Sequence, residues 1–253
     1  MGEAKAPAIR YIGHATVLVA MNGARLLTDP LLRGRVAHLR RAGRSDAAVP
    51  HDVDAVLISH LHFDHLDFGS LARLGSDVRV VVPRGGGALL GGKGRRGNVT
   101  EITAGETIEI GGVRVRATPA VHDRRRLPFG ARAEPLGYRL EGERSVYFAG
   151  DTDVFPGMAE IAPLDVALVP VWGWGPSMGP GHMNPARAAE SLRLLQPRIA
   201  IPIHWGTYYP WHLGVRKRPK WLDTPPLTFK TDAAAVAAAV EVRILRPGER
   251  TTI

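Results

Sequence analysis

The chain begins with short apolar runs that are separated by turn residues. Runs at 9–12 and 15–19 predict a pair of strands, and Asn22-Gly23 predicts a hairpin turn into a third strand at 25–28. Similar strand patterns recur at 78–82, 107–110, 113–117, 137–140 and 145–149. Three runs are continuously apolar, a pattern typical of central buried strands, at 55–58, 166–171 and 199–203.

Helix signals are fewer than strand signals. Asp67 is suited to cap a short helix over 67–73, and Asn184 followed by Pro185 begins a second helix. Two more elements are expected near the end of the chain, a helix over 233–240 capped at Thr231-Asp232 and a closing strand over 241–245.

Two segments have no regular apolar pattern. Residues 33–51 are polar and rich in arginine, which indicates a mobile surface loop. Residues 84–97 are basic and rich in glycine, but they lack the residue order of a phosphate-binding loop.

The densest group of chemically active side chains follows the strand at 55–58. Three histidines and an aspartate have the spacing H-x-H-x-D-H, at His60, His62, Asp64 and His65. Neutral imidazoles and a carboxylate bind divalent metals of intermediate softness, and sites are built where central strands end. Neighbouring side chains in an extended loop point in opposite directions, so we expect two metals side by side. A structural metal site is disfavoured, because such sites use cysteine and the chain has none.

This motif resembles the metallo-β-lactamase superfamily, and specifically its branch of ascorbate phosphate lactonases and N-acyl-phosphatidylethanolamine-hydrolysing phospholipases D. The run 148–152, Phe-Ala-Gly-Asp-Thr, is similar to the bridging-carboxylate motif, and 202–207, Pro-Ile-His-Trp-Gly-Thr, is the match most specific to the branch. The resemblance implies an α/β (α+β) fold, a four-layer αββα sandwich of two mixed sheets with helices outside. No linker divides the chain, so we expect a single hydrolase domain over 1–253.

The resemblance also implies a set of seven metal ligands. One metal would be held by His60, His62 and His122, a second by Asp64, His65 and His204, with Asp151 as the bridge. Gly150 would let the backbone at Asp151 approach the metals closely. Zinc is the expected metal at both positions, and manganese or iron also suits these ligand types.

Other residues of the site are expected on weaker grounds. By resemblance His14 and Asp29 would support the ligands, although a structural histidine and a turn-capping aspartate would give the same pattern. Asp64 would orient the attacking nucleophile, and His182 is a candidate for proton transfer or substrate contact, against simple packing at a helix entry. Substrate-binding candidates are Arg124, Arg125, Arg126, Trp172, Trp174 and His182. The alternative for the three arginines is a solvated position on a surface loop.

The implied activity is a binuclear metal-dependent hydrolase in which a metal-bridging hydroxide attacks an ester, lactone or phosphodiester. Acyl-enzyme routes are disfavoured, because the chain has neither cysteine nor a G-x-S-x-G motif. The alternatives are a metal-dependent phosphodiesterase or nuclease acting on nucleic acid, and a non-catalytic metal-binding sensor. A sensor would be expected to lack a ligand, whereas all seven are present. The lipid-cleaving members have long N-terminal extensions that this chain lacks, which disfavours a membrane lipid as substrate.

Bulk composition sets the remaining expectations. The net charge is +9, which suits an anionic small-molecule substrate but equally an arginine-rich proteome. The basic residues are spread along the chain rather than massed, so no stable nucleic-acid partner is expected. No apolar run is long enough to span a membrane, and Met1-Gly2-Glu3-Ala4-Lys5 begins no signal peptide. These features predict a cytoplasmic protein, and a homo-oligomer is left open.

Overall fold

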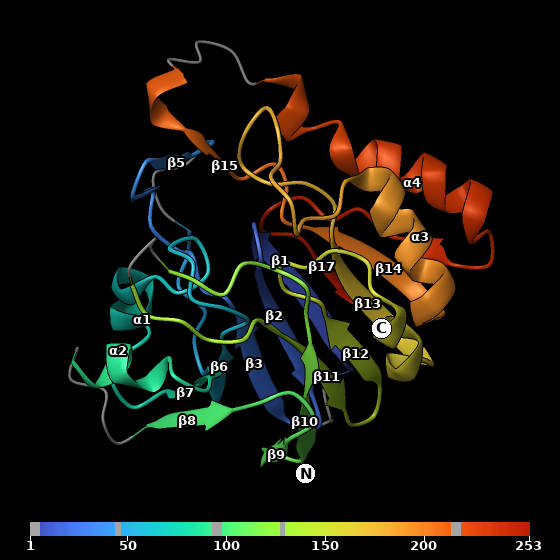
Figure 1. Ribbon diagram of the computed structural model, residues 1–253. Helices are drawn as coiled ribbons and strands as arrows, with labels where there is room; N and C mark the ends of the chain where they lie inside the picture. The colour runs from blue at the N-terminus through green and yellow to red at the C-terminus, as the bar shows by residue number, and fades with distance from the viewer. Residues whose placement is uncertain (1–5, 44–46, 93–97, 127–129, 214–218) are drawn as a thin grey trace.

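Two large mixed β-sheets lie face to face, with helices on the outer side of each, in the computed structural model of the protein (Figure 1). The structure describes residues 6–43, 47–92, 98–126, 130–213 and 219–253. The predicted αββα sandwich is confirmed. The expectations for residues 1–5 and for the end of the glycine-rich segment, 93–97, lie outside the described residues.

The first sheet begins with antiparallel strands and continues with parallel ones. Asn22 and Gly23 both have positive φ, 50° and 77°, as a tight two-residue hairpin turn requires. The strand order is β17 (Arg250–Thr252), β1 (Ala8–Gly13), β2 (Thr16–Met21), β3 (Ala24–Thr28), β6 (Ala55–Leu57), β7 (Arg79–Pro83) and β8 (Val99–Ile102). Strands β3, β6, β7 and β8 are parallel to one another.

The second sheet has the same mixture of strand directions. Its order is β16 (Glu241–Val242), β14 (Pro197–Ile203), β13 (Leu164–Pro170), β12 (Ser145–Phe148), β11 (Leu136–Glu141), β10 (Val113–Pro119) and β9 (Thr107–Ile110). Strands β12, β13, β14 and β16 run parallel, so their carboxyl ends reach one edge of the sandwich.

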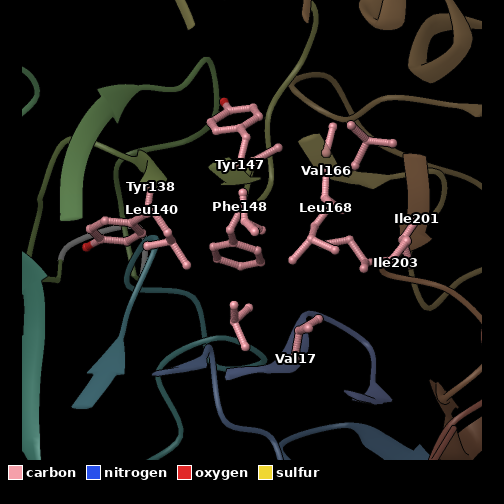
Figure 2. Close-up of a cluster of buried hydrophobic side chains, with 14 of the residues drawn as sticks. Val17, Tyr138, Leu140, Tyr147, Phe148, Val166, Leu168, Ile201 and Ile203 are labelled. Carbon is pink, nitrogen blue, oxygen red and sulfur yellow. The ribbon is translucent and has the colours of Figure 1, made fainter. Parts of the chain in front are cut away.

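The main core lies between the two sheets. In Figure 2, Phe148 and Leu168 of the second sheet point toward Val17 of the first. The neighbouring residue Leu18 points the opposite way and packs in a second cluster with Leu71, because successive side chains of a strand alternate between its faces. The first sheet is therefore buried on both faces near its centre.

The helices cover the outer faces of the sheets (Figure 1). On the first sheet lie α1 (Phe68–Arg73) and α2 (Gly87–Gly91), and on the second α3 (Pro185–Leu195) and α4 (Pro225–Val236). The chain also has three 3-10 turns in its described residues, η1 (Pro156–Ile161), η2 (Trp211–Leu213) and η3 (Lys220–Leu222), of which η2 follows β15 of the small third sheet. The N-caps predicted at Asp67 and Asn184 are confirmed, since each accepts a hydrogen bond from the backbone N–H three residues on. The N-cap predicted at Thr231-Asp232 was wrong, because these residues lie inside α4, whose N-cap position is Thr224.

The segment 33–51, predicted to be a mobile loop, instead forms part of a small third sheet in its described residues. This sheet contains β4 (Arg35–Val36), β5 (Leu39–Arg41) and β15 (Tyr208–Pro210). Val36 and Leu39 are buried against Tyr208, and β5 pairs with a strand from the far end of the chain. The prediction was wrong because the pairing partner is remote in sequence.

Two predictions for the end of the chain were also wrong in their boundaries. The helix expected over 233–240 is α4, which begins at Pro225 and ends at Val236. Proline at the first helical positions sets this start, and burial of Phe229 and Ala233 holds the helix on the second sheet. The closing strand expected over 241–245 ends at Val242, and a further strand, β17, pairs with β1.

Candidate metal centre

The seven predicted ligands converge on one edge of the sandwich. His60, His62, Asp64 and His65 follow β6 in a segment that we call the histidine loop, residues 60–65, and the other three follow β10, β12 and β14, namely His122, Asp151 and His204. Strand ends of both sheets therefore supply the site, as expected for parallel strands whose carboxyl ends meet at an edge.

Three imidazoles form a first cluster that could hold one cation. The ligand atoms of His60, His62 and His122 lie within 4.8 Å of one another, and His62 Nδ1 is 3.1 Å from His122 Nε2. Two nitrogens bound tetrahedrally to one zinc ion lie about 3.3–3.4 Å apart. In the described part of the chain, the buried Nε2 of His60 has no hydrogen-bond partner, which suits a metal ligand.

A second cluster combines two imidazoles and a carboxylate. His65 Nε2 lies 3.2 Å from His204 Nε2, and Asp64 Oδ2 is 3.6 Å and 3.7 Å from these two nitrogens. The side chains of both histidines are buried. These separations again match those between ligands of a single ion.

Asp151 lies between the two clusters. Its Oδ2 is 3.3 Å from His65 Nε2 and 3.2 Å from His204 Nε2, and it also groups with His122 and His182. Its Oδ1 is buried and, among the described residues, makes no hydrogen bond. The carboxylate therefore contacts one cluster and presents an unpaired oxygen in the same buried space.

Asp29 and Ser59 support two ligands from behind. Asp29 Oδ2 is 2.7 Å from His65 Nδ1 and accepts a 2.5 Å hydrogen bond from Ser59 Oγ. Ser59 Oγ is also 2.9 Å from His60 Nδ1. The Nδ1 atoms of both imidazoles are thus engaged behind the site, so the Nε2 atoms face it, the usual arrangement around a bound metal.

Backbone carbonyls orient two more imidazoles. His122 Nδ1 donates to the carbonyl of Gly181 at 2.8 Å, and His204 Nδ1 donates to that of Trp172 at 2.7 Å. A carbonyl can only accept, so it fixes the proton on Nδ1 and leaves the Nε2 lone pair for a cation.

His14 supports the candidate ligand Asp64. Its Nε2 is 2.9 Å from Asp64 Oδ2, and its own backbone is held by hydrogen bonds to Thr207 and His204. His14 has a φ of 59°, which places its ring beside that of His204 with centroids 3.9 Å apart. Both His14 and Asp29 therefore contact candidate ligands directly, and their supporting roles stay predictions.

The charges in the site favour a cation. Burial and neighbouring imidazoles hold the pKa of His60 well below its usual range, so this ring is neutral and able to bind a metal. Burial alone would lower the pKa of His65, but the carboxylates of Asp151 and Asp64 outweigh it and raise that pKa. A divalent cation would replace the proton at such a position, because metal binding and protonation compete for one lone pair.

His182 lies at the exposed side of this centre. Its Nε2 is 3.4 Å from Asp151 Oδ2, and its ring meets that of His122 edge-on, with centroids 4.6 Å apart. Burial would lower the pKa of His182, but the hydrogen bond to Asp151 and its charge raise it to about 9. The sequence prediction that His182 lies at the site is therefore consistent with its position, while its role stays a prediction.

The three arginines after His122 have different surroundings. Arg124 is exposed and pairs with Glu134 at 2.9 Å. A hollow of about 290 Å³, which we call the His122 hollow, is lined by His122, Asp123, Arg124, Arg125 and Arg132.

Arg126 is engaged with the histidine loop. Its guanidinium donates to the carbonyls of Leu61 and Leu66 and lies 4.3 Å from the centroid of the Phe63 ring and 4.9 Å from that of Phe68. Arg126 therefore connects the two ends of the loop that contains His62. Its guanidinium, which was expected to bind substrate, is engaged in these contacts.

The two tryptophans are also separated. Trp172 is half-buried, donates from its indole to the carbonyl of Gly175, and orients His204 through its own carbonyl. Trp174 packs against the cluster of the small third sheet, edge-on to His38 with centroids 4.7 Å apart. Their roles in substrate binding stay predictions.

Comparison with known proteins identifies the family. The family model of the β-lactamase superfamily domain matches residues 24–205, a range that contains all seven candidate ligands. The chain belongs to the β-lactamase superfamily. Within it, the chain is 34% identical over 257 residues to the UPF0173 metal-dependent hydrolase of Methanopyrus kandleri, covering 95% of this chain and 97% of that protein.

A second relative and a solved structure are also similar to this chain. The chain is 33% identical to the N-acyl-phosphatidylethanolamine-hydrolyzing phospholipase D 1 of Caenorhabditis elegans, covering 78% of this chain and 63% of that protein. A metallo hydrolase of Ignicoccus hospitalis has the same fold, with a TM-score of 0.73 and 22% identity over 98% of this chain and 99% of that one.

These comparisons make this β-lactamase superfamily member a metal-dependent hydrolase, so the expectation of an enzyme rather than a sensor is confirmed. None of the helices among the described residues is long and apolar enough to cross a membrane.

Sequence reasoning missed several residues of this superfamily site. Ser59 directly precedes the histidine loop, but a lone serine at a strand end has no distinctive signal. The carbonyls of Gly181 and Trp172 cannot be found from sequence at all, because every residue has one. The positions of Arg132 and of Arg126 against the histidine loop depend on an antiparallel bridge between Arg125 and Arg132, which no local sequence pattern predicts.

Proposed function

We propose that this protein is a binuclear metal-dependent hydrolase. The observation that supports this proposal most is the position of Asp151. Its carboxylate lies beside the Nε2 atoms of His65 and His204 and also groups with His122 of the other cluster. A shared carboxylate of this kind suits two cations about 3.5–4 Å apart. Zinc is the proposed metal, since five imidazoles and two carboxylates match its ligand preferences.

Residues of the chain would have different roles around the two cations. Two bound cations would lower the pKa of a water and polarise a substrate oxygen. Asp64, held by His14 at 2.9 Å, is fixed where it can accept a hydrogen bond from the attacking group. His182 is at the open side, where its Nε2 could donate a proton to the departing oxygen.

We infer that the substrate is an ester, lactone or phosphodiester, and a phosphodiester is the first choice. Arginine side chains of the His122 hollow lie beside a proposed metal ligand. One guanidinium group can donate two parallel hydrogen bonds to two oxygens of a phosphate. The similarity to a protein named a phospholipase D supports the same bond type. A carboxylic ester or lactone is the second candidate, because the two-cation centre would serve either reaction.

A substrate panel tests this proposal. Zinc-loaded protein is assayed with bis(4-nitrophenyl) phosphate, 4-nitrophenyl acetate and a γ-lactone, with Asp151→Ala and the exposed control Asp77→Asn in parallel. We expect hydrolysis of the phosphodiester, its loss with chelator or Asp151→Ala, and its retention in Asp77→Asn. Fully metal-loaded protein that hydrolyses none of the three classes, or Asp151→Ala with normal turnover, would contradict the proposal.

A further inference from the structure

A second basic hollow lies outside the metal centre, beside the small third sheet. Its volume is about 570 Å³, and five arginines line it, from the segment before β4, from β4, from β5 and from α1, namely Arg33, Arg35, Arg40, Arg41 and Arg73. The other described lining residues are Gly34 and Gly43, so none of the described residues that line it is acidic. We call it the arginine hollow.

Two of these arginines face each other across a strand pair. Arg35 of β4 and Arg40 of β5 are directly opposed in the antiparallel register, and both are exposed. Like charges directly opposite each other destabilise a strand pair, and this pair of strands is very short. An anion between the two guanidinium groups would replace that repulsion with attraction.

Other arginines of the hollow are held in place. Arg33 forms a two-bonded ion pair with Asp67, at 2.8 Å and 2.6 Å. Arg41 is buried and donates to the carbonyl of Ile12 at 2.7 Å and to the hydroxyl of Tyr208 at 3.3 Å. Side chains fixed in this way lose little further conformational entropy when a ligand binds.

Part of the positive charge is exposed. Asp67 pairs with Arg33, whereas Arg35 and Arg40 present two exposed guanidinium groups to the hollow. Each of these two opposed guanidinium groups can donate two parallel hydrogen bonds to the oxygens of a multiply charged anion. A phosphate group offers both the charge and the number of acceptor oxygens.

The hollow is separate from the metal centre. The guanidinium of Arg41 lies 5.5 Å from the ring centroid of Tyr208. On the side of the metal centre, the ring centroid of His14 is 5.6 Å from that of Tyr208. Buried Arg41 and Tyr208 thus stand between the hollow and the ligand Asp64, which His14 contacts.

We propose that the arginine hollow is a binding site for a small, soluble, phosphate-bearing ligand, distinct from the hydrolytic centre. This site goes beyond the proposed hydrolysis and does not depend on it. A phosphate group would lie between Arg35 and Arg40, with Arg73 of α1 closing the opposite side.

Calorimetric titration of inorganic phosphate into the full, metal-loaded chain at low ionic strength tests the proposal. We expect a binding event that weakens as salt is added, because exposed charges are screened. Arg35→Gln combined with Arg40→Gln should weaken this event at least about tenfold, the effect of losing one or two charge-assisted hydrogen bonds. Any phosphate bound at the metal centre should be unaffected by this pair of changes.

The matched control removes the same charge from another strand. Arg114→Gln with Arg116→Gln changes two exposed arginines of β10 and should leave phosphate binding unchanged. The double change at Arg35 and Arg40 could disturb the short β4–β5 strand pair. Arg73→Gln, on α1, avoids these strands and should also weaken phosphate binding. Equal phosphate affinity in wild type and in both hollow variants, or equal weakening in the β10 control, would overturn the proposal. Binding to phosphatidate vesicles without any binding of inorganic phosphate would overturn it too.

Discussion

Asp29 and His65 form a fully buried carboxylate–imidazole pair, with Oδ2 2.7 Å from Nδ1. Asp29 also accepts from the backbone N–H of Ser59 at 2.7 Å, so the carboxylate is fixed on two sides. The pair sets the proton on Nδ1 of His65 and directs Nε2 toward His204 and Asp151.

The first prediction concerns this pair. Asp29→Asn keeps the shape of the side chain but removes the charge that holds His65, so metal affinity should fall by about 10–100-fold. Competition with a chromophoric chelator measures the affinity. Asp77→Asn, an exposed change away from the site, is the control, and an unchanged affinity in Asp29→Asn would show that the pair does not position the ligand.

The second prediction concerns Arg126 as a positioning residue. Arg126→Met keeps an apolar stem against Phe63 but removes the donors to the carbonyls of Leu61 and Leu66. We expect the free energy of unfolding to fall by about 1–3 kcal/mol, because two carbonyls lose a charged donor. Metal affinity should fall as well, since the histidine loop loses its tie.

Urea denaturation and chelator competition give the two readouts for Arg126. Arg124→Met is the matched control, because Arg124 is exposed and pairs only with the exposed Glu134 among the contacts described. A surface ion pair of that kind contributes about 0–1 kcal/mol. Equal effects in the two variants would remove the special role of Arg126.

The convergence of the candidate ligands was predictable from sequence, because they lie in segments that follow apolar strands. The spacing at His60, His62, Asp64 and His65 is local, and His204 and Asp151 follow strands whose patterns are strong. The sandwich was predictable for the same reason, together with the family resemblance.

The parts that were missed depend on contacts between remote segments. The small third sheet forms because β5 pairs with β15, and no pattern in 33–51 indicates that partner. Arg126 was expected to face substrate, but its guanidinium instead contacts the histidine loop. The folded shape of that loop cannot be read from the sequence. The same is true of the carbonyl of Gly181 that orients His122.

The third prediction concerns substrate charge at the His122 hollow. Arg125→Ala and Arg132→Ala should each lower kcat/KM for anionic substrates by about 1.5–3 kcal/mol, because a charge-assisted hydrogen bond to substrate is lost. Neutral analogues should be nearly unaffected, and the difference should shrink in high salt. The exposed Arg114→Ala on β10 is the control. Equal losses for charged and neutral substrates would contradict an anion-binding role.

The fourth prediction concerns removal of metal. Asp64 and Asp151 are buried carboxylates, and bound cations would stabilise the folded state by mass action. At free metal about 1,000 times Kd this amounts to about 4 kcal/mol, so chelation should lower Tm by about 8–16 °C. Calorimetry before and after chelation measures the shift, and reloading should restore it. An unchanged Tm would show that the centre is not occupied by a stabilising metal.

The central claim is that two cations share the carboxylate of Asp151, and the metal content of the purified protein tests it most directly. Elemental analysis of wild-type protein, titrated with zinc and freed of unbound ions, should approach two metals per chain. Asp151→Ala in the same titration should fall well below two, because the shared ligand is gone. Wild-type protein that saturates at one metal per chain, or Asp151→Ala that retains two, would contradict the binuclear centre.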